Sequence, residues 1–241
     1  MKPYALSTSR ARALYGIPTA PKRNRALELC CQRDSLLLDC SWSGESRTVC
    51  TAGSENVPEI HPSLRQVDYG KPLPFEPGSF ELILLHKTLD DLRFASLRQR
   101  KEFNAGQFVT QLAGLLVPGG VVAGCVGNAG SPKRIKRMLA LQGAGAVADT
   151  QPFLTMRGSQ RLLQMSGFVD IRLFSLLPDC DDPLKLVEFT PAVSRFGFRQ
   201  EFEARRDQMS ALSYWLRRCV AGLGLYPYFE ESIFFWAYKP C

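Results

Sequence analysis

The sequence predicts one α/β domain built on a doubly wound, mainly parallel sheet. Two observations carry this prediction. Residues 82–85 form a continuous apolar run, which is typical of a parallel strand covered on both faces. A helical segment, 103–116, is followed by Pro-Gly-Gly and then by a second apolar strand, 121–126, which is the alternation that such a sheet requires.

Length and composition agree with this fold class. The 241 residues are enough for one well-buried domain, and 45% hydrophobic with 22% charged residues is typical of a globular protein. No run of about 18 apolar residues predicts a membrane span, and residues 1–10 lack the apolar core of a secretory signal. We therefore expect a cytoplasmic location.

Charge and cysteine usage exclude several function classes. The net charge of +7 is spread over small clusters, so an RNA-binding or RNA-modifying role rests on charge alone and a nucleic-acid partner is not expected. Eight cysteines show no C-x-x-C spacing, and only His61 and His86 could complete a metal site. We expect buried free thiols and no metal.

The elements follow in order. Residues 1–24 are expected to form an N-terminal extension with a helix over 8–15, and residues 25–241 the domain. A short helix is expected over 35–42 and another over 159–165. Strands are expected at 26–29, 47–51, 82–85, 121–126, 167–174 and 232–239.

Two segments resemble a known family. The stretch from Leu73 to Leu85 reads Leu-Pro-Phe, a Pro-Gly turn, Ser-Phe-Glu and a buried strand, and residues 26–38 read as a first strand with its turn. With the other strands, this order resembles class I S-adenosylmethionine (SAM) methyltransferases over residues 25–239, in the branch that acts on small molecules, lipids or glycans. The resemblance implies a Rossmann-like methyltransferase sheet with an antiparallel last strand and SAM as cofactor.

The resemblance also shows a degenerate cofactor motif. The family pattern after the first strand is acid-x-Gly-x-Gly-x-Gly; here Glu28 is the acid, and Cys30, Gln32 and Asp34 take the glycine places. Glycine is used there because the turn and the approach of the ligand leave no room for a Cβ. The motif therefore predicts that SAM binding is weak or lost.

Further site residues are implied by position. The acid that usually binds the ribose hydroxyls falls on Ala52, whereas the acid that meets the adenine amine is present as Asp68, beside Tyr69. His86 follows the fourth strand, where the substrate end of the cofactor lies in the family. An ordinary loop acid at Asp68 and a structural histidine at His86 stay open as alternatives.

A second register is also open for the first strand. Residues 36–44 could form it, with Asp39 as the acid and Gly44 as the surviving glycine. Too few residues would then separate it from the strand at 47–51, and Ser41 and Glu45 would replace glycines. Both registers predict a poor SAM site.

The connection 177–231 is long enough to require structure of its own. We expect a helical insertion that acts as a cap or as a binding surface for a protein partner or a second copy of the chain. Its apolar residues recur at helical spacing, at Phe202, Met209, Leu212, Trp215 or Leu216, Cys219 and Leu223.

Two functions follow. The first is a non-catalytic or partner-dependent pseudo-methyltransferase subunit. The alternative is an active SAM-dependent methyltransferase acting on a small, lipid-linked or glycan substrate, with the insertion as its lid.

Overall fold

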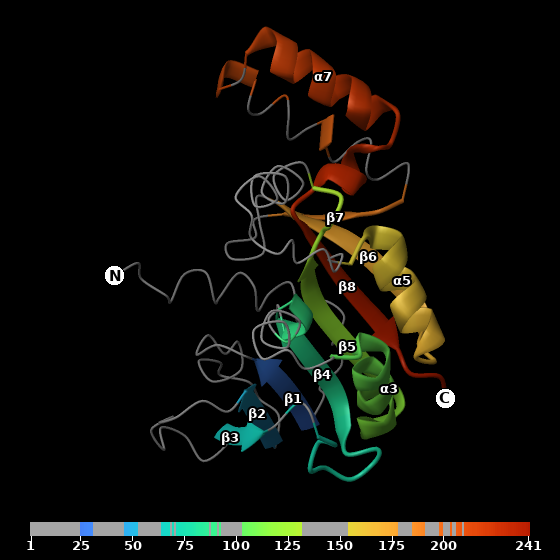
Figure 1. Ribbon diagram of the computed structural model, residues 1–241. Coiled ribbons are helices and arrows are strands. Elements are labelled where there is room, and N and C mark those ends of the chain that lie inside the picture. The colour runs from blue at the N-terminus through green and yellow to red at the C-terminus, as the bar shows by residue number, and fades with distance from the viewer. Residues whose placement is uncertain are drawn as a thin grey trace.

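The structure contains one mixed sheet flanked by helices (Figure 1). The computed structural model describes residues 25–30, 46–52, 64–67, 69, 71–86, 88–90, 92, 103–131, 154–177, 185–190, 198–199, 203, 206–208 and 210–241. Within these residues the sheet has eight strands: β1 (Arg25–Cys30), β2 (Ser46–Ala52), β3 (Leu64–Val67), β4 (Phe80–His86), β5 (Leu116–Gly127), β6 (Val169–Leu177), β7 (Lys185–Glu188) and β8 (Ser232–Tyr238).

The strand order is β3-β2-β1-β4-β5-β8-β6-β7. The pairs that join β3, β2, β1, β4 and β5 are all parallel, whereas β8 is antiparallel to both β5 and β6. The doubly wound sheet and the antiparallel pairing of its last two expected strands are thus confirmed. The order reverses between β1 and β4, and ligands of such sheets bind at the carboxyl ends of the strands beside that point.

The structure shows which of the two candidate segments forms the first strand. Arg25–Cys30 lies between β2 and β4, with Leu27 paired to Thr48 on one side and to Ile83 on the other. The strand at the centre of the sheet is therefore the one that carries Glu28. The competing segment, 36–44, lies outside the described residues.

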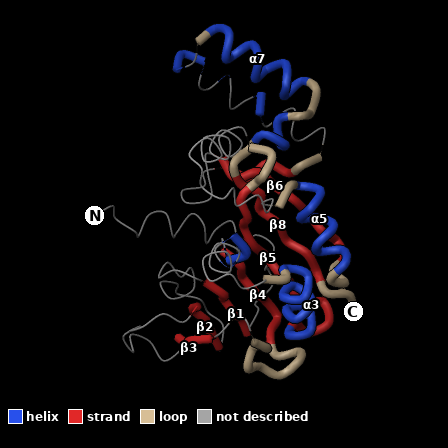
Figure 2. The backbone as a smooth tube through the Cα atoms, in the orientation of Figure 1, coloured by secondary structure: helices blue, strands red, loops and turns tan. Residues whose placement is uncertain are grey.

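Two helices cover one face of the sheet. α3 (Ala105–Leu115) and α5 (Met156–Met165) lie against β4, β5 and β6 on the same side (Figures 1 and 2). Each begins at a polar cap: Asn104 Oδ1 accepts from the Gln107 N–H, and Thr155 Oγ1 accepts from the Gly158 N–H, each at 3.0 Å. These caps satisfy amide groups that the first helical turn leaves without partners.

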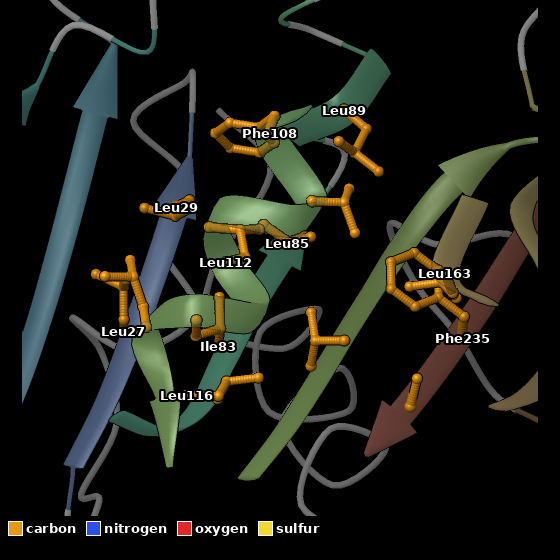
Figure 3. Close-up of a cluster of buried hydrophobic side chains, with 14 of the residues drawn as sticks. Leu27, Leu29, Ile83, Leu85, Leu89, Phe108, Leu112, Leu116, Leu163 and Phe235 are labelled. Carbon is orange, nitrogen blue, oxygen red and sulfur yellow. The ribbon is translucent and has the colours of Figure 1, made fainter. Parts of the chain in front are cut away.

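The main core lies between these helices and the sheet. Figure 3 shows Leu27 and Leu29 of β1 beside Ile83 and Leu85 of β4, with Phe108 and Leu112 of α3 against them. Alternate residues of the same strands point to the opposite face, where Ala26, Leu82, Leu84, Ala123, Phe174 and Trp236 form a second cluster. β4 is therefore apolar on both faces, as its uninterrupted run of apolar residues predicts.

The sequence prediction for Pro-Gly-Gly was wrong in one respect. We expected residues 117–120 to end the helix and the strand to begin at Val121, but β5 begins at Leu116, immediately after α3. The Gly119 N–H donates to the Lys239 carbonyl at 3.0 Å, and the Lys239 N–H donates to the Gly120 carbonyl at 2.8 Å. The end of β8 thus draws this stretch into the sheet, and the φ of +71° at Gly119 is one that favours glycine.

The insertion is not only helical. Its described residues include β7, which pairs antiparallel with β6 at the edge of the sheet, and the helix α7 (Ala211–Gly222). Figure 1 shows α7 at the end of the molecule beyond β7. None of the helices in the described part of the chain is long and apolar enough to cross a membrane.

Gly124 of β5 leaves no room for a Cβ between Leu85 of β4 and Phe235 of β8. A Cβ there would lie 2.6 Å from Phe235 Cζ and 2.8 Å from the Leu85 carbonyl oxygen. We expect Gly124→Ala to lower the free energy of unfolding by about 1–3 kcal/mol, because an overpacked core must shift. Urea denaturation measures this change.

Gly114→Ala is the matched control. Gly114 lies on α3, and a Cβ there meets nothing within 4 Å. Alanine is the better helix former, so this variant should be more stable by roughly 0.5–1 kcal/mol. Equal stability of the two variants would contradict the described packing of β5 against β8.

Candidate functional site

The candidate site lies at the carboxyl ends of β1, β2 and β4. Cys30 is the last residue of β1 and pairs with Thr51, the neighbour of Ala52 at the end of β2. His86 ends β4, whose Leu85 pairs with Leu29 of β1. The backbone thus brings Cys30, Ala52 and His86 to one edge of the sheet, as expected from parallel strands.

Glu28 is the first site residue with a described side chain. It is 0% exposed, in the middle of β1, between Val49 of β2 and Leu84 of β4. The carboxyl group is not isolated there, since Glu28 has an interaction partner within the protein. Complete burial of a carboxyl group requires such a partner, because an unpaired charge would be very costly.

Tyr69 lies in the core. It is buried, and its ring meets the ring of Phe108 on α3 edge to face, with the centroids 5.9 Å apart. Through this contact Tyr69, two residues after the end of β3, packs against α3, the helix that covers β4. Of the other expected site residues, Gln32, Asp34 and Asp68 lie outside the described residues.

The turn after β4 contains two polar residues that sequence reasoning missed. The hydroxyl of Thr88 donates to the carbonyl of Leu29 on β1. The carboxylate of Asp90 accepts from the Gly127 N–H at the end of β5, over 2.6 Å. Both side chains are buried. Residues 88–90 therefore bridge the strands on either side of β4, at the edge of the sheet where the candidate site lies.

Asn128 forms a second junction, between β5 and the end of the insertion. Its Nδ2 donates to the carbonyls of Tyr228 and Glu230, at 3.0 and 2.8 Å, and its Oδ1 accepts from the Gly130 N–H at 3.0 Å. The Asn128 N–H also donates to the Glu231 carbonyl at 2.9 Å. The insertion is therefore fastened at the carboxyl end of β5, close in sequence to the residue that Asp90 holds.

A signal for these residues exists in the sequence. Thr88, Asp90 and Asn128 are the polar side chains that directly follow the two most apolar strands, β4 and β5. Polar residues in that position are either ligand contacts or backbone anchors, and hydrogen bonding shows these three to be anchors. In the described residues no three His, Cys, Asp or Glu side chains are grouped as a metal site.

Comparison with solved structures identifies the fold. A SAM-dependent methyltransferase from Archaeoglobus fulgidus superimposes with a TM-score of 0.59 at 12% identity, over 98% of this chain and 95% of that one. A SAM-dependent methyltransferase from Thermotoga maritima, described as a possible histamine N-methyltransferase, gives 0.55 at 12% identity over 98% and 89%.

A third similar structure holds the cofactor. Phosphoethanolamine N-methyltransferase 2 of Haemonchus contortus, in complex with S-adenosyl-L-methionine, gives a TM-score of 0.55 at 14% identity. The match covers 97% of this chain and 53% of that one, so this chain spans about half the length of the nematode enzyme. No protein-family model and no curated protein sequence matches this chain.

The chain thus has the fold of class I SAM-dependent methyltransferases. The mainly parallel sheet and the antiparallel β8 are those that the sequence resemblance implied. At 12–14% identity the likeness defines the fold, and it leaves activity to be argued from the site.

Asp90→Ala should destabilise the protein. It leaves the buried Gly127 N–H without its carboxylate acceptor, and we expect the free energy of unfolding to fall by about 1–3 kcal/mol. Asp90→Asn is the control, since its amide oxygen can still accept this hydrogen bond and should recover most of the loss. Thermal denaturation measures the stability of both variants. Equal stability of Asp90→Ala and Asp90→Asn would contradict the anchoring role.

Proposed function

We propose that this protein is a methyltransferase-like subunit with a degenerate SAM site, which acts without catalysis or depends on a partner for it. The observation that carries the proposal is Ala52 at the end of β2, one residue beyond the Thr51 that pairs with Cys30 at the end of β1. These positions correspond to the ribose-binding acid and to a glycine of the cofactor turn in the resemblance. An intact framework therefore surrounds a site whose ligand-binding groups are replaced.

The replaced residues should lower the binding free energy of SAM considerably. A methyl side chain at position 52 cannot accept hydrogen bonds from ribose hydroxyls, and each polar group buried without a partner costs about 1–3 kcal/mol. Gln32 and Asp34 add side chains where the family has glycine. Each loss of about 1.4 kcal/mol weakens binding tenfold, so two or three such losses move a micromolar ligand toward millimolar affinity.

Loss of cofactor binding removes most of what such an enzyme contributes. The sulfonium of SAM is already activated, so methyl transfer depends chiefly on alignment of the two reactants. The described polar side chains after β4 and β5 support the same view, because Thr88, Asp90 and Asn128 hold backbone groups in place.

The proposal gives the insertion, residues 177–231, the role of an interaction surface. Its support is the exposed apolar face of α7. A protein partner or a second copy of the chain is the occupant that the sequence suggests. The cytoplasmic location expected from the N-terminal sequence stays a prediction, which microscopy of the tagged full-length chain tests.

An active methyltransferase for a small, lipid-linked or glycan substrate is the second candidate. One observation favours it: Glu28 is retained as the acid of β1 and is fully buried between β2 and β4. Under this alternative, His86 at the end of β4 lies at the substrate side, and Asp68 and Tyr69 bind near the adenine.

Calorimetric titration separates the two. We expect the purified chain to bind SAM and S-adenosylhomocysteine with a dissociation constant weaker than about 100 μM. Near-complete saturation at low micromolar cofactor would refute the pseudo-enzyme proposal in favour of the active enzyme.

Restoring the motif should restore affinity. We expect the triple variant Gln32→Gly, Asp34→Gly, Ala52→Asp to bind SAM at least about tenfold more tightly than the natural chain, because it supplies the missing space and the ribose acceptor. The control replaces Ala52→Asp by Ala52→Val, which adds volume without an acceptor and should gain less. Circular dichroism confirms that both variants fold, and equal affinity of all three proteins would contradict the assignment of the motif.

A further inference from the structure

α7 presents an apolar stripe to solvent. Leu212, Trp215 and Leu223 are 70%, 63% and 69% exposed, and Leu216 and Cys219 between them are exposed as well. Their spacing of three and four residues places all five on one side of the helix. Apolar side chains gathered in this way on an exposed surface mark an interaction site.

The opposite side of α7 packs against other parts of the insertion. Ala221 is buried with Val187 of β7 and Phe198, and Tyr214 and Tyr226 pack against this cluster. The rings of Phe198 and Tyr226 lie 4.4 Å apart. The helix is therefore held by its other face, and the apolar stripe is not a cover for this part of the domain.

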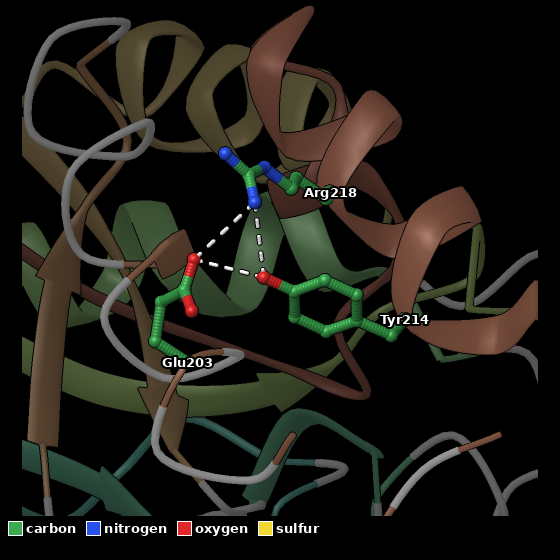
Figure 4. Close-up of polar contacts among 3 residues, drawn as sticks. All are labelled: Glu203, Tyr214 and Arg218. Carbon is green, nitrogen blue, oxygen red and sulfur yellow. Dashed lines mark hydrogen bonds and ion pairs between the residues drawn. The ribbon is translucent and has the colours of Figure 1, made fainter. Parts of the chain in front are cut away.

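Polar contacts fix the same orientation. Figure 4 shows Tyr214 donating to Glu203 Oε1 at 2.8 Å, while Arg218 Nη1 lies 3.1 Å from the Tyr214 hydroxyl and 3.5 Å from the same carboxylate oxygen. The preceding residue is Arg217, and its Nη1 contacts the Tyr226 hydroxyl at 3.5 Å. Both arginines thus lie on the half of α7 opposite the stripe, and both are exposed.

The charge of the helix favours an anionic partner. α7 contains Arg217 and Arg218 and no acidic residue, and the whole chain carries a net charge of +7. A helix with leucines and a tryptophan on one face and arginines on the other, polar face is the pattern of helices that lie in the headgroup layer of a membrane. Arginine side chains can keep their charge among the headgroups while their stems lie along the apolar surface.

The area of the stripe disfavours another protein. The stripe consists of five residues on a helix about 18 Å long, whereas a stable interface takes about 20–30 residues from each partner. A stable interface buries about 800 Å² on each partner. A second copy docked through α7 alone would fall well short of that area, whereas a lipid surface has no such threshold because each inserted side chain contributes separately.

We propose that α7 docks the protein on the surface of an anionic lipid bilayer, with Leu212, Trp215, Leu216 and Leu223 in the headgroup and upper acyl layer. The inference rests on the interaction surface proposed above, and it assigns lipid as the occupant in place of the protein partner or second copy that the sequence suggests. It does not depend on whether SAM binds.

Flotation of the full chain with vesicles tests the proposal. The natural chain should float with vesicles of phosphatidylcholine and phosphatidylserine, and less with phosphatidylcholine alone or at high salt, because anionic headgroups attract the arginines. The variant Leu216→Glu, Leu223→Glu should bind at least about tenfold more weakly. Met165→Glu is the matched control: Met165 is 77% exposed on α5, so its substitution should leave binding unchanged.

Fluorescence gives a second readout. On addition of anionic vesicles the emission of Trp215 should shift to the blue, since Trp215 is exposed and enters an apolar layer. Trp215→Phe should abolish that shift and keep most of the flotation, because phenylalanine remains apolar. Circular dichroism of every variant confirms that α7 is retained.

Three results would overturn the proposal: no flotation of the natural chain, equal flotation of the double glutamate variant, or a dimer in light scattering that this variant dissolves. The last would assign the stripe to a second copy. SAM titration in the absence of vesicles is independent, so tight SAM binding together with stripe-dependent flotation would remove the pseudo-enzyme proposal and leave this one standing.

Discussion

The structure depends on the burial of β4 between β1 and β5. Leu82, Ile83, Leu84 and Leu85 are almost completely inaccessible, and alternate members belong to the clusters on the two faces of the sheet. At about 25 cal/mol per Å² of apolar surface, such a strand is a major source of stability. It also fixes the positions of β1, β5 and the turn at 88–90, and through them the edge where the candidate site lies.

This source of stability is separate from the groups that bind a cofactor. The core lies within the sheet and under α3 and α5, whereas Cys30, Ala52 and His86 stand at the ends of their strands. Substitutions in such terminal positions leave the packing of β4 untouched. A chain can therefore keep the class I methyltransferase fold at 12–14% identity to its structural neighbours while its cofactor turn diverges.

Elements formed by local sequence patterns could be predicted, whereas elements that depend on distant parts of the chain could not. The strands expected at 26–29, 82–85, 121–126 and 232–239 correspond to β1, β4, β5 and β8, because burial leaves a plain apolar pattern in the sequence. β7 was not expected, since Lys185–Glu188 is a strand only through its pairing with β6. The start of β5 was misplaced because the partner of Gly119 is Lys239, at the far end of the chain.

The candidate site divides in the same way. Glu28, Cys30, Ala52 and His86 could be placed at strand positions from the sequence, since parallel strands end at a common edge. The anchoring roles of Asp90 and Asn128 could not, because their partners lie 37 and about 100 residues away. The stripe on α7 was visible from its spacing, but only the packing of Tyr214 and Ala221 shows that it faces outward.

The short edges of the sheet have a consequence for how this protein behaves at high concentration. In the described part of the chain the sheet is bounded by β3 and β7, and each has only four residues. An edge strand exposes amide and carbonyl groups that can recruit a strand from another molecule, and brevity is one way in which proteins limit this. The long, apolar strands β4, β5 and β8 are all interior, so the segments most prone to cross-β stacking become accessible only when the sheet itself opens.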